Sequence, residues 1–189
     1  MKTINLFKSA FLAMFFLGST LAFAQSEKTV TVGGAPMYPS KNIVENAVNS
    51  KDHTTLVAAV QAAGLVETLQ TPGPFTVFAP DNAAFEKLPA GTVESLVKPE
   101  NKATLTSILT YHVVAGKMGS KEIAAAIKKG NGKATLTTVQ GGKLTAWMKG
   151  KDLYISDENG NQSKVTIADV YQSNGVIHSI DTVVLPKSE

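Results

Sequence analysis

Apolar residues recur at helical spacing through much of the first two-thirds of the chain. In the segment 40–49 they stand at positions i, i+1, i+4 and i+5 behind Ser40, a residue type that caps helix N-termini. The segment 53–63 shows similar spacing behind Asp52 and stops at Gly64, as a helix with a C-terminal glycine does. Comparable patterns predict further helices over the segments 81–88, 92–97, 99–114 and 120–129.

A different pattern begins at residue 134. Runs rich in β-branched residues are separated by short turns that contain glycine or asparagine, as far as residue 185. This spacing predicts an antiparallel meander of hairpins. One earlier strand is predicted at 75–79, between the breaker TPGP and Pro80. Because helices come first and strands later, the sequence predicts an α+β fold rather than an alternating α/β fold.

The first 39 residues are expected to lie outside the folded domain. Residues 1–24 have the features of a secretory signal peptide: two lysines, an apolar stretch and a small-x-small cleavage pattern. Residues 25–39 are rich in glycine and proline without periodicity, which predicts a flexible leader. A single domain is expected over residues 40–187. The protein should therefore be exported, to the periplasm or the extracellular space, with no stable membrane anchor after signal cleavage.

Composition narrows the classes of partner and the source of stability. Without the predicted signal peptide, the chain has 16 lysines and 15 acidic residues, so its net charge of +1 identifies no partner. It contains no arginine, the residue best suited to bidentate recognition of phosphates and bases, and nucleic acid is not an expected partner. It also contains no cysteine, so the domain must be stabilised by its core rather than by disulfides.

No catalytic or metal-binding motif is complete. Residues 130–135 and 157–162 match a phosphate-binding loop and a calcium-binding loop only in part, because each lacks residues that the motif requires. No two of His53, His112 and His178 stand at metal-ligand spacing, and no cysteine is present to assist them. We therefore expect no catalytic site, no cofactor, no metal site and no enzymatic activity.

Trp147 is the only tryptophan in the chain, and it stands next to Met148 in a predicted strand. Neighbouring residues of a strand point to opposite faces, so one of the two faces outward. Whichever of the two is exposed could mark a contact patch.

Three stretches of the sequence together resemble the fasciclin domain family. The stretch GPFTVFAPDNAAFEKLP at 73–89 is similar to the first conserved box of that family, and GVIHSIDTVVLP at 175–186 is similar to the second. Between them, LTYHVVAGK at 109–117 resembles the Tyr-His element of the family. The resemblance covers roughly residues 41–187. It implies a wedge-shaped β-sandwich flanked by several α-helices, which agrees with the α+β pattern.

The resemblance also implies an exported, non-enzymatic protein that mediates adhesion or partner binding. In animal members, the Tyr-His element and an Asp-Ile element are linked to integrin binding. The corresponding positions here are Tyr111, His112, Asp169 and Val170, with valine in place of isoleucine. The expected partner is a protein or polysaccharide on a cell surface or in a matrix. Because some fasciclin-type proteins bind carotenoids, the alternative is a carrier that holds a lipid or carotenoid-like molecule in an apolar cleft.

The other motif residues are expected to serve the fold. Asp81 or Asn82 should cap a helix, and buried aromatic residues should pack the core. His178 and Asp181 stand on opposite faces of an ideal strand, so each should bond to neighbouring backbone or loops. The expected structural residues are Phe75, Val77, Phe78, Pro80, Asn82, Phe85, Gly175, His178 and Asp181.

Overall fold

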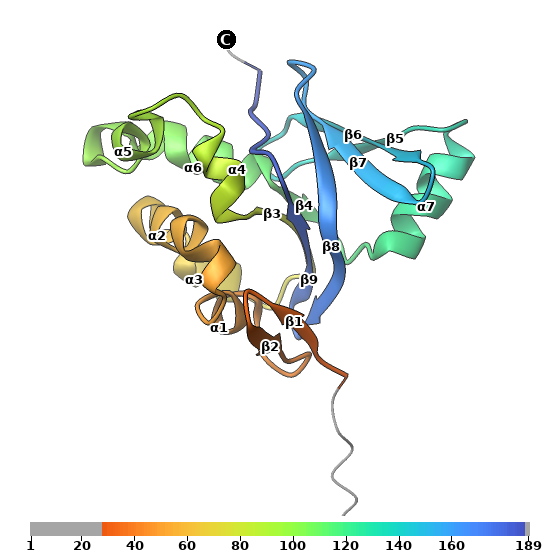
Figure 1. Ribbon diagram of the computed structural model, residues 1–189, viewed down its shortest axis with the longest axis horizontal. Coiled ribbons are helices and arrows are strands. Elements are labelled where there is room, and N and C mark those ends of the chain that lie inside the picture. The colour runs from red at the N-terminus through yellow and green to blue at the C-terminus, as the bar shows by residue number, and fades with distance from the viewer. Residues whose placement is uncertain (1–27, 188–189) are drawn as a thin grey trace, which may run out of the picture.

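The computed structural model describes residues 28–187, which combine seven α-helices with nine β-strands (Figure 1). The predicted signal peptide, residues 1–24, lies outside the described residues. The helices are α1 (Ile43–Ala47), α2 (Thr54–Ala63), α3 (Val66–Gln70), α4 (Asn82–Glu86), α5 (Thr92–Leu96), α6 (Lys102–Tyr111) and α7 (Ser120–Lys129), with 3₁₀ turns at Lys51–His53 and Pro99–Asn101. The strands are β1 (Val30–Val32), β2 (Ala35–Met37), β3 (Phe75–Pro80), β4 (Val113–Ala115), β5 (Ala134–Thr137), β6 (Lys143–Lys149), β7 (Asp152–Ser156), β8 (Gln162–Gln172) and β9 (Gly175–Ile180).

The ends of the first two helices follow ordinary capping chemistry. Helix α1 begins after Asn42 rather than Ser40. The Asn42 side chain accepts a hydrogen bond from the Glu45 N–H, and the Glu45 carboxylate accepts one from the Asn42 N–H. This capping box satisfies two amides that the helix itself leaves unpaired. Helix α2 ends as predicted at Gly64, which adopts the left-handed conformation.

Two features of the helical region differ from the prediction. The predicted helix over 99–114 opens with a 3₁₀ turn and ends at Tyr111, and residues 113–115 instead form β4, which pairs with β3. Val113 and Val114 are β-branched and fit a buried strand better than a helix end. Helix α3 has no counterpart among the predicted helices, because five residues are too few for helical periodicity to show.

Seven strands form one sheet in the order β4-β3-β9-β8-β7-β6-β5. Consecutive strands from β5 to β9 are antiparallel neighbours, which confirms the predicted meander. Strand β3 joins this meander through parallel pairing with β9. A bridge between Val114 and Thr138 brings the two edges of the sheet together, so that the sheet is curved and nearly closed (Figure 1).

The paired strands β3 and β9 separate two hydrophobic clusters. Val77 and Ile177 face a cluster that also contains residues of the hairpin β1–β2, of α1, α2 and α6, and of β4 and β8. Phe78 and Ile180 face the other cluster, which α7 covers and which includes the inward side chains of β5, β6 and β7. Both faces of the two central strands are therefore buried, and β9 is buried along its whole length.

Residues 30–37 correct the prediction of a flexible leader, because they form the hairpin β1–β2. Val32 and Met37 are only 4% and 3% exposed and belong to the cluster beneath the helices. Gly33 and Gly34, both with positive φ, form the two-residue turn. Each strand has only three residues, too few for alternation to be recognised, and the Gly-Gly dipeptide was the one signal that favoured a hairpin.

Because the hairpin packs on the core, substituting its buried residues should lower the stability of the protein, whereas substitutions in a flexible leader would not. Met37→Ala should lower the free energy of unfolding by about 2 kcal/mol, the low end for a buried methionine because Met37 also borders a cavity. Thr31→Ala, an exposed position of the same hairpin, should change it by less than about 0.5 kcal/mol. Urea unfolding followed by circular dichroism measures both variants. Equal stability of the two variants would contradict the docked hairpin.

Candidate functional site

An apolar cavity of ≈ 250 Å³ lies between the helices α1 to α3 and the face of the sheet that carries Val77 and Ile177. Val32 and Met37 of the hairpin contribute to its wall, so the segment that the sequence assigns to a leader helps to build it. Val48 and Val139 also line the cavity and are 53% and 51% exposed, so the cavity reaches the surface. No lysine, aspartate or glutamate lines it among the residues that the structure describes.

The buried and half-buried polar side chains of the cavity wall have partners within the protein. The His53 ring lies 2.9 Å from Ser50 Oγ through Nδ1 and 3.2 Å from Ser179 Oγ through Nε2. The Thr110 hydroxyl donates to the Thr106 carbonyl at 2.7 Å. Burial lowers the pKa of His53, which opposes a charge on this ring. The wall therefore offers mainly apolar surface to a ligand.

His112, one of the residues expected to bind a partner, is 3% exposed and lies in the same wall. Its Nδ1 lies 2.8 Å from the Ile108 carbonyl, which only accepts, so Nδ1 carries the proton. Its Nε2 accepts a hydrogen bond from the Val184 N–H at 3.3 Å and must therefore be unprotonated. These two bonds fix a neutral imidazole, and burial lowers its pKa to about 4.

Tyr111 is fully buried, and its side chain packs in the cluster under α7 rather than in the cavity wall where His112 lies. Its hydroxyl donates to the Lys143 carbonyl at 2.7 Å and accepts from the Glu158 N–H at 3.3 Å. Burial raises its pKa to about 12. Tyr111 thus joins the end of α6 to β6 and to the turn that follows β7.

Asp169 and Val170 do not form a surface with Tyr111 and His112. Val170 is 1% exposed and packs in the cavity wall. The half-buried Asp169 has positive φ at an irregularity of β8 and accepts hydrogen bonds from the N–H and hydroxyl of Ser120, the first residue of α7. Its carboxylate thereby stabilises the N-terminus of that helix. The expectation of a four-residue binding surface is corrected, because three of the four side chains are buried.

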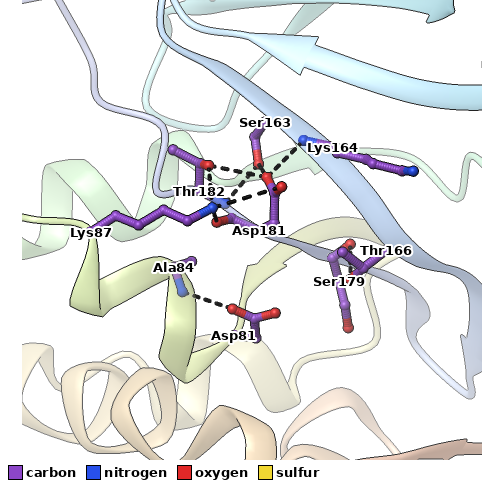
Figure 2. Close-up of polar contacts among 9 residues, drawn as sticks. All are labelled: Asp81, Ala84, Lys87, Ser163, Lys164, Thr166, Ser179, Asp181 and Thr182. Carbon is purple, nitrogen blue, oxygen red and sulfur yellow. Dashed lines mark hydrogen bonds and ion pairs between the residues drawn. The ribbon is translucent and has the colours of Figure 1, made fainter.

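Asp81 and Asn82 are both capping residues, but they cap different helices. Asp81 caps its own helix, α4, by accepting from the Ala84 N–H at 2.7 Å (Figure 2). Asn82 Oδ1 instead accepts from the Thr55 N–H in the first turn of α2, and its amide donates to the Lys51 carbonyl. The residue that precedes α2, His53, makes no side-chain capping bond. Asn82 therefore supplies the cap of α2 from a distant part of the sequence.

His178 and Asp181 make the contacts with neighbouring backbone that the sequence predicts. His178 is fully buried, stacks on the Phe78 ring at 5.6 Å, and donates from Nε2 to the Met118 carbonyl at 2.9 Å. Burial lowers its pKa, and the bond to Met118 raises it in part. His178 thus joins β9 to the loop before α7.

The Asp181 carboxylate lies among donors from two other segments (Figure 2). It accepts from the Lys164 N–H at 2.9 Å and from the Ser163 hydroxyl at 3.2 Å, and the Lys87 ammonium lies 3.7 Å away. Desolvation raises the pKa of Asp181, but the hydrogen bonds from Lys164, Thr182 and Ser163 and the charge of Lys87 together leave the pKa below its usual range. No contact joins Asp181 to His178.

The remaining motif residues lie in or beside the two clusters. Val77 and Phe78 are buried and Phe75 and Phe85 are half-buried, all packed in the core, and Pro80 ends β3. Gly175 is needed for close packing, since an added Cβ would lie 2.3 Å from the Phe75 carbonyl oxygen. In the described part of the chain, no three histidine, aspartate or glutamate side chains form a metal-binding group.

The family model named Fasciclin domain matches residues 51–186, most of the chain. The chain belongs to the fasciclin domain family. This confirms the resemblance carried by the two boxes and the Tyr-His element. The hairpin and α1 precede the matched region, so part of the cavity wall comes from residues that the family model does not cover.

Relatives of this fasciclin domain occur in bacteria and animals. The chain is 47% identical to the Synechocystis protein sll1483 over 170 residues, which is 88% of this chain and 87% of that one. It is 37% identical to immunogenic protein MPB70 of Mycobacterium bovis over 74% of this chain and 66% of that protein. Transforming growth factor-beta-induced protein ig-h3 of Sus scrofa is 36% identical over 78% of this chain, which spans only 20% of that protein.

A solved structure confirms the fold. The FAS1 domain pair of the insect cell adhesion molecule fasciclin I superposes with a TM-score of 0.68 at 17% identity, over 85% of this chain and 58% of that one. The fasciclin-type α+β architecture expected from the sequence is therefore correct. Within residues 28–187, no helix is long and apolar enough to cross a bilayer.

Acid should destabilise the fold through its buried histidines. Below pH 6.5 the unfolded chain takes up a proton on His112 that the folded chain accepts only near pH 4. The contribution of the neutral ring is therefore complete above pH 6.5 and is lost as the pH falls towards 4, by about 3 kcal/mol. Urea unfolding at a series of pH values should show His112→Gln less stable than wild type at pH 7 but less dependent on pH. An unchanged pH dependence would contradict this assignment.

Two substitutions of Asn82 should lower the stability of the protein to different degrees. Asn82→Ala removes both the acceptor for α2 and the bond to Lys51, and should lower the free energy of unfolding by about 2 kcal/mol. Asn82→Asp keeps the acceptor and should cost less than Asn82→Ala. Thermal unfolding at pH 7 ranks the two, and an Asp variant as unstable as the Ala variant would show that α2 does not depend on this acceptor.

Proposed function

We propose that this protein is an exported, non-enzymatic fasciclin-domain protein that carries an apolar small molecule, a lipid or carotenoid-like compound, in the cavity between α1–α3 and the sheet. The observation that carries the proposal is the cavity itself. A carrier needs an apolar cleft that reaches the surface, and the described residues provide one.

The chemistry of the wall favours a neutral and largely apolar ligand. Burial lowers the pKa of both His53 and His112, and the Val184 N–H that bonds to His112 Nε2 further opposes a second proton there. Among the described residues, no lysine stands in the wall to pair with a buried carboxylate. A charged group buried here without a partner would cost several kcal/mol. A polar head group of the ligand would therefore remain at the mouth, beside Val48 or Val139.

The size of the cavity limits how much of a ligand it encloses. At ≈ 250 Å³ it exceeds the roughly 150 Å³ of an engineered apolar cavity that binds benzene, and lies just below the about 300 Å³ at which typical ligand pockets begin. A ring or a length of alkyl chain fits inside. The rest of a longer molecule would extend through the opening.

Adhesion or partner binding at a cell surface or in a matrix is the second candidate function. Its support comes from relatives: one solved neighbour is a domain pair from a cell adhesion molecule, and another relative, MPB83 of Mycobacterium bovis, is named a cell surface glycolipoprotein. Tyr111, His112 and Val170 are buried in this structure, so a partner would have to contact a different surface.

Retinol, a neutral ring-and-polyene molecule, tests the carrier function. Val57 on α2 lines the cavity, while its neighbour Ala58 is exposed and does not. Retinol should bind the purified protein with a saturable rise in fluorescence. Val57→Phe, which fills the cavity, should weaken binding at least 10-fold, and Ala58→Phe should leave it within 2-fold.

Circular dichroism and the thermal midpoint show whether each variant is folded, and Val44→Phe on α1 provides a second filling variant. Retinol binding that is equally strong in wild type, Val57→Phe and Val44→Phe would exclude the cavity as the binding site. Absence of binding to the wild-type protein, together with no coloured or lipid compound in an organic extract of protein purified from its host, would overturn the carrier function.

A further inference from the structure

The outer face of the strands β6, β7 and β8 carries an aromatic pair. The register places Trp147 opposite Tyr154 and Tyr154 opposite Lys164, so these side chains share one face. The two rings lie 5.7 Å apart with an interplanar angle of 21°. Neither belongs to a hydrophobic cluster, and both are half-buried, so their outer ring surface is open to solvent.

Lysines and hydroxyl groups surround this pair. Lys143 and Lys149 stand on the same face of β6, and Lys151 lies in the turn to β7; all three are exposed. Hydroxyl and amide groups on the same face make no side-chain hydrogen bond to another described residue: Thr135, Thr137, Thr145, Ser156 and Gln162.

The acidic residues near this face are largely engaged. Asp152 pairs with Lys164 at 2.8 Å, and the Glu158 carboxylate accepts a hydrogen bond from the Lys143 N–H. In the described part of the chain, the ammonium groups of Lys143, Lys149 and Lys151 have no ion-pair partner. They remain able to pair with an external anion.

Positive charge is concentrated in the part of the chain that contains this face, and negative charge in the helical part. Residues 117–164, which include α7 and β5 to β7, contain nine lysines and four acidic residues. Residues 42–101, which include α1 to α5, contain three lysines and seven acidic residues. The two regions lie on opposite sides of the molecule (Figure 1), so a polyanion would be attracted to the half that contains β5 to β7 and repelled by the other. Within that half, the lysines of α7 stand on the opposite face of the sheet from Trp147, and the lysines beside the aromatic pair are Lys143, Lys149 and Lys151.

From these observations we infer that this face binds an acidic polysaccharide. The aromatic pair provides a flat apolar surface for the C–H face of a sugar ring, the free hydroxyl and amide groups can bond to sugar hydroxyls, and the lysines neutralise the acidic groups of the polymer. The inference gives the second candidate function a partner class and a surface, and it rests on that function rather than on the cavity.

Other occupants fit the face less well. A nucleic acid would call for arginine, which the chain lacks. A bilayer surface would call for aliphatic side chains to insert beside the lysines, but the neighbours of the aromatic pair are threonine, serine and glutamine. A second copy of this chain would bring two groups of lysines together, which repel each other.

The single tryptophan makes binding directly measurable, because all tryptophan fluorescence reports on Trp147. Polygalacturonate and dextran sulfate are titrated into the purified protein, with uncharged dextran as the control polymer. At least one acidic polymer should change the emission in a saturable way, dextran should not, and 0.5 M NaCl should weaken the binding at least 10-fold, as roughly expected for contacts made by several lysines.

Affinity electrophoresis in gels that contain the polymer extends the test to variants without tryptophan. Trp147→Ala and Tyr154→Ala should each weaken binding at least 5-fold, and the double variant K143Q/K149Q at least 10-fold. Lys98→Gln removes a positive charge from an exposed site among the helices, and should change binding less than 2-fold. Thermal midpoints close to that of wild type confirm that each variant is folded.

Several outcomes would overturn the inference. They are no response to either acidic polymer, equal binding of dextran, binding unaffected by the aromatic and lysine variants, or a response only to vesicles that contain anionic phospholipid. Retinol binding should be unchanged in Trp147→Ala. A negative polysaccharide result with intact retinol binding therefore rejects this inference alone, and polysaccharide binding without retinol binding or an extractable apolar compound rejects the carrier function alone.

Discussion

The parallel pairing of β3 with β9 is the constraint on which the rest of this structure depends. It joins residues 75–80 to residues 175–180, a hundred positions apart, and both strands are buried on both faces. The pair therefore divides the interior into a cluster under the helices and a cluster under α7. The two conserved boxes of the family include these strands and the corners that follow them, which explains why the boxes identify the fold.

Polar residues of the boxes stabilise the positions of neighbouring segments. Asn82 caps α2, Asp181 binds the backbone of β8, and His178 binds the loop that leads to α7. Each bond joins segments that are distant in sequence, and each buried donor or acceptor would be costly without its partner. The neutral state of His112 follows from the same requirement, because a second proton on its ring would oppose the Val184 N–H.

The sequence predicted the fold better than it predicted the site. Periodicity and turn residues were sufficient for the meander and for most helices, because each signal lies within one element. The parallel pairing of β3 and the capping of α2 by Asn82 depend on contacts between distant residues, which a local pattern does not reveal. The burial of Tyr111, His112 and Val170 could not be predicted for the same reason. The motif identifies these positions in the sequence, but it does not reveal which way their side chains point. An apolar cleft was the alternative expectation, but its position was not predicted, because its wall combines short elements, including the hairpin around Gly33 and Gly34.

The two proposed binding regions lie on different sides of the β3–β9 pair, and this bears on whether they can act together. The cavity borders the face of the sheet that carries Ile177, whereas Trp147 and Tyr154 lie on the outer face of β6 and β7. Strand β8 touches both, through Val170 at the cavity and Lys164 beside Tyr154, and the β5–β6 loop also reaches the cavity through Val139. The pairing of β8 with β9 shifts register twice between Lys164 and Val170, and Asp169 adopts positive φ there. Irregularities of this kind interrupt the hydrogen-bond ladder and bend the strand, so the two ends of β8 are not one continuous rigid element. A ligand in the cavity and a polymer on the outer face should therefore bind independently, so that carrying an apolar molecule and attaching to a surface are compatible roles for one small domain.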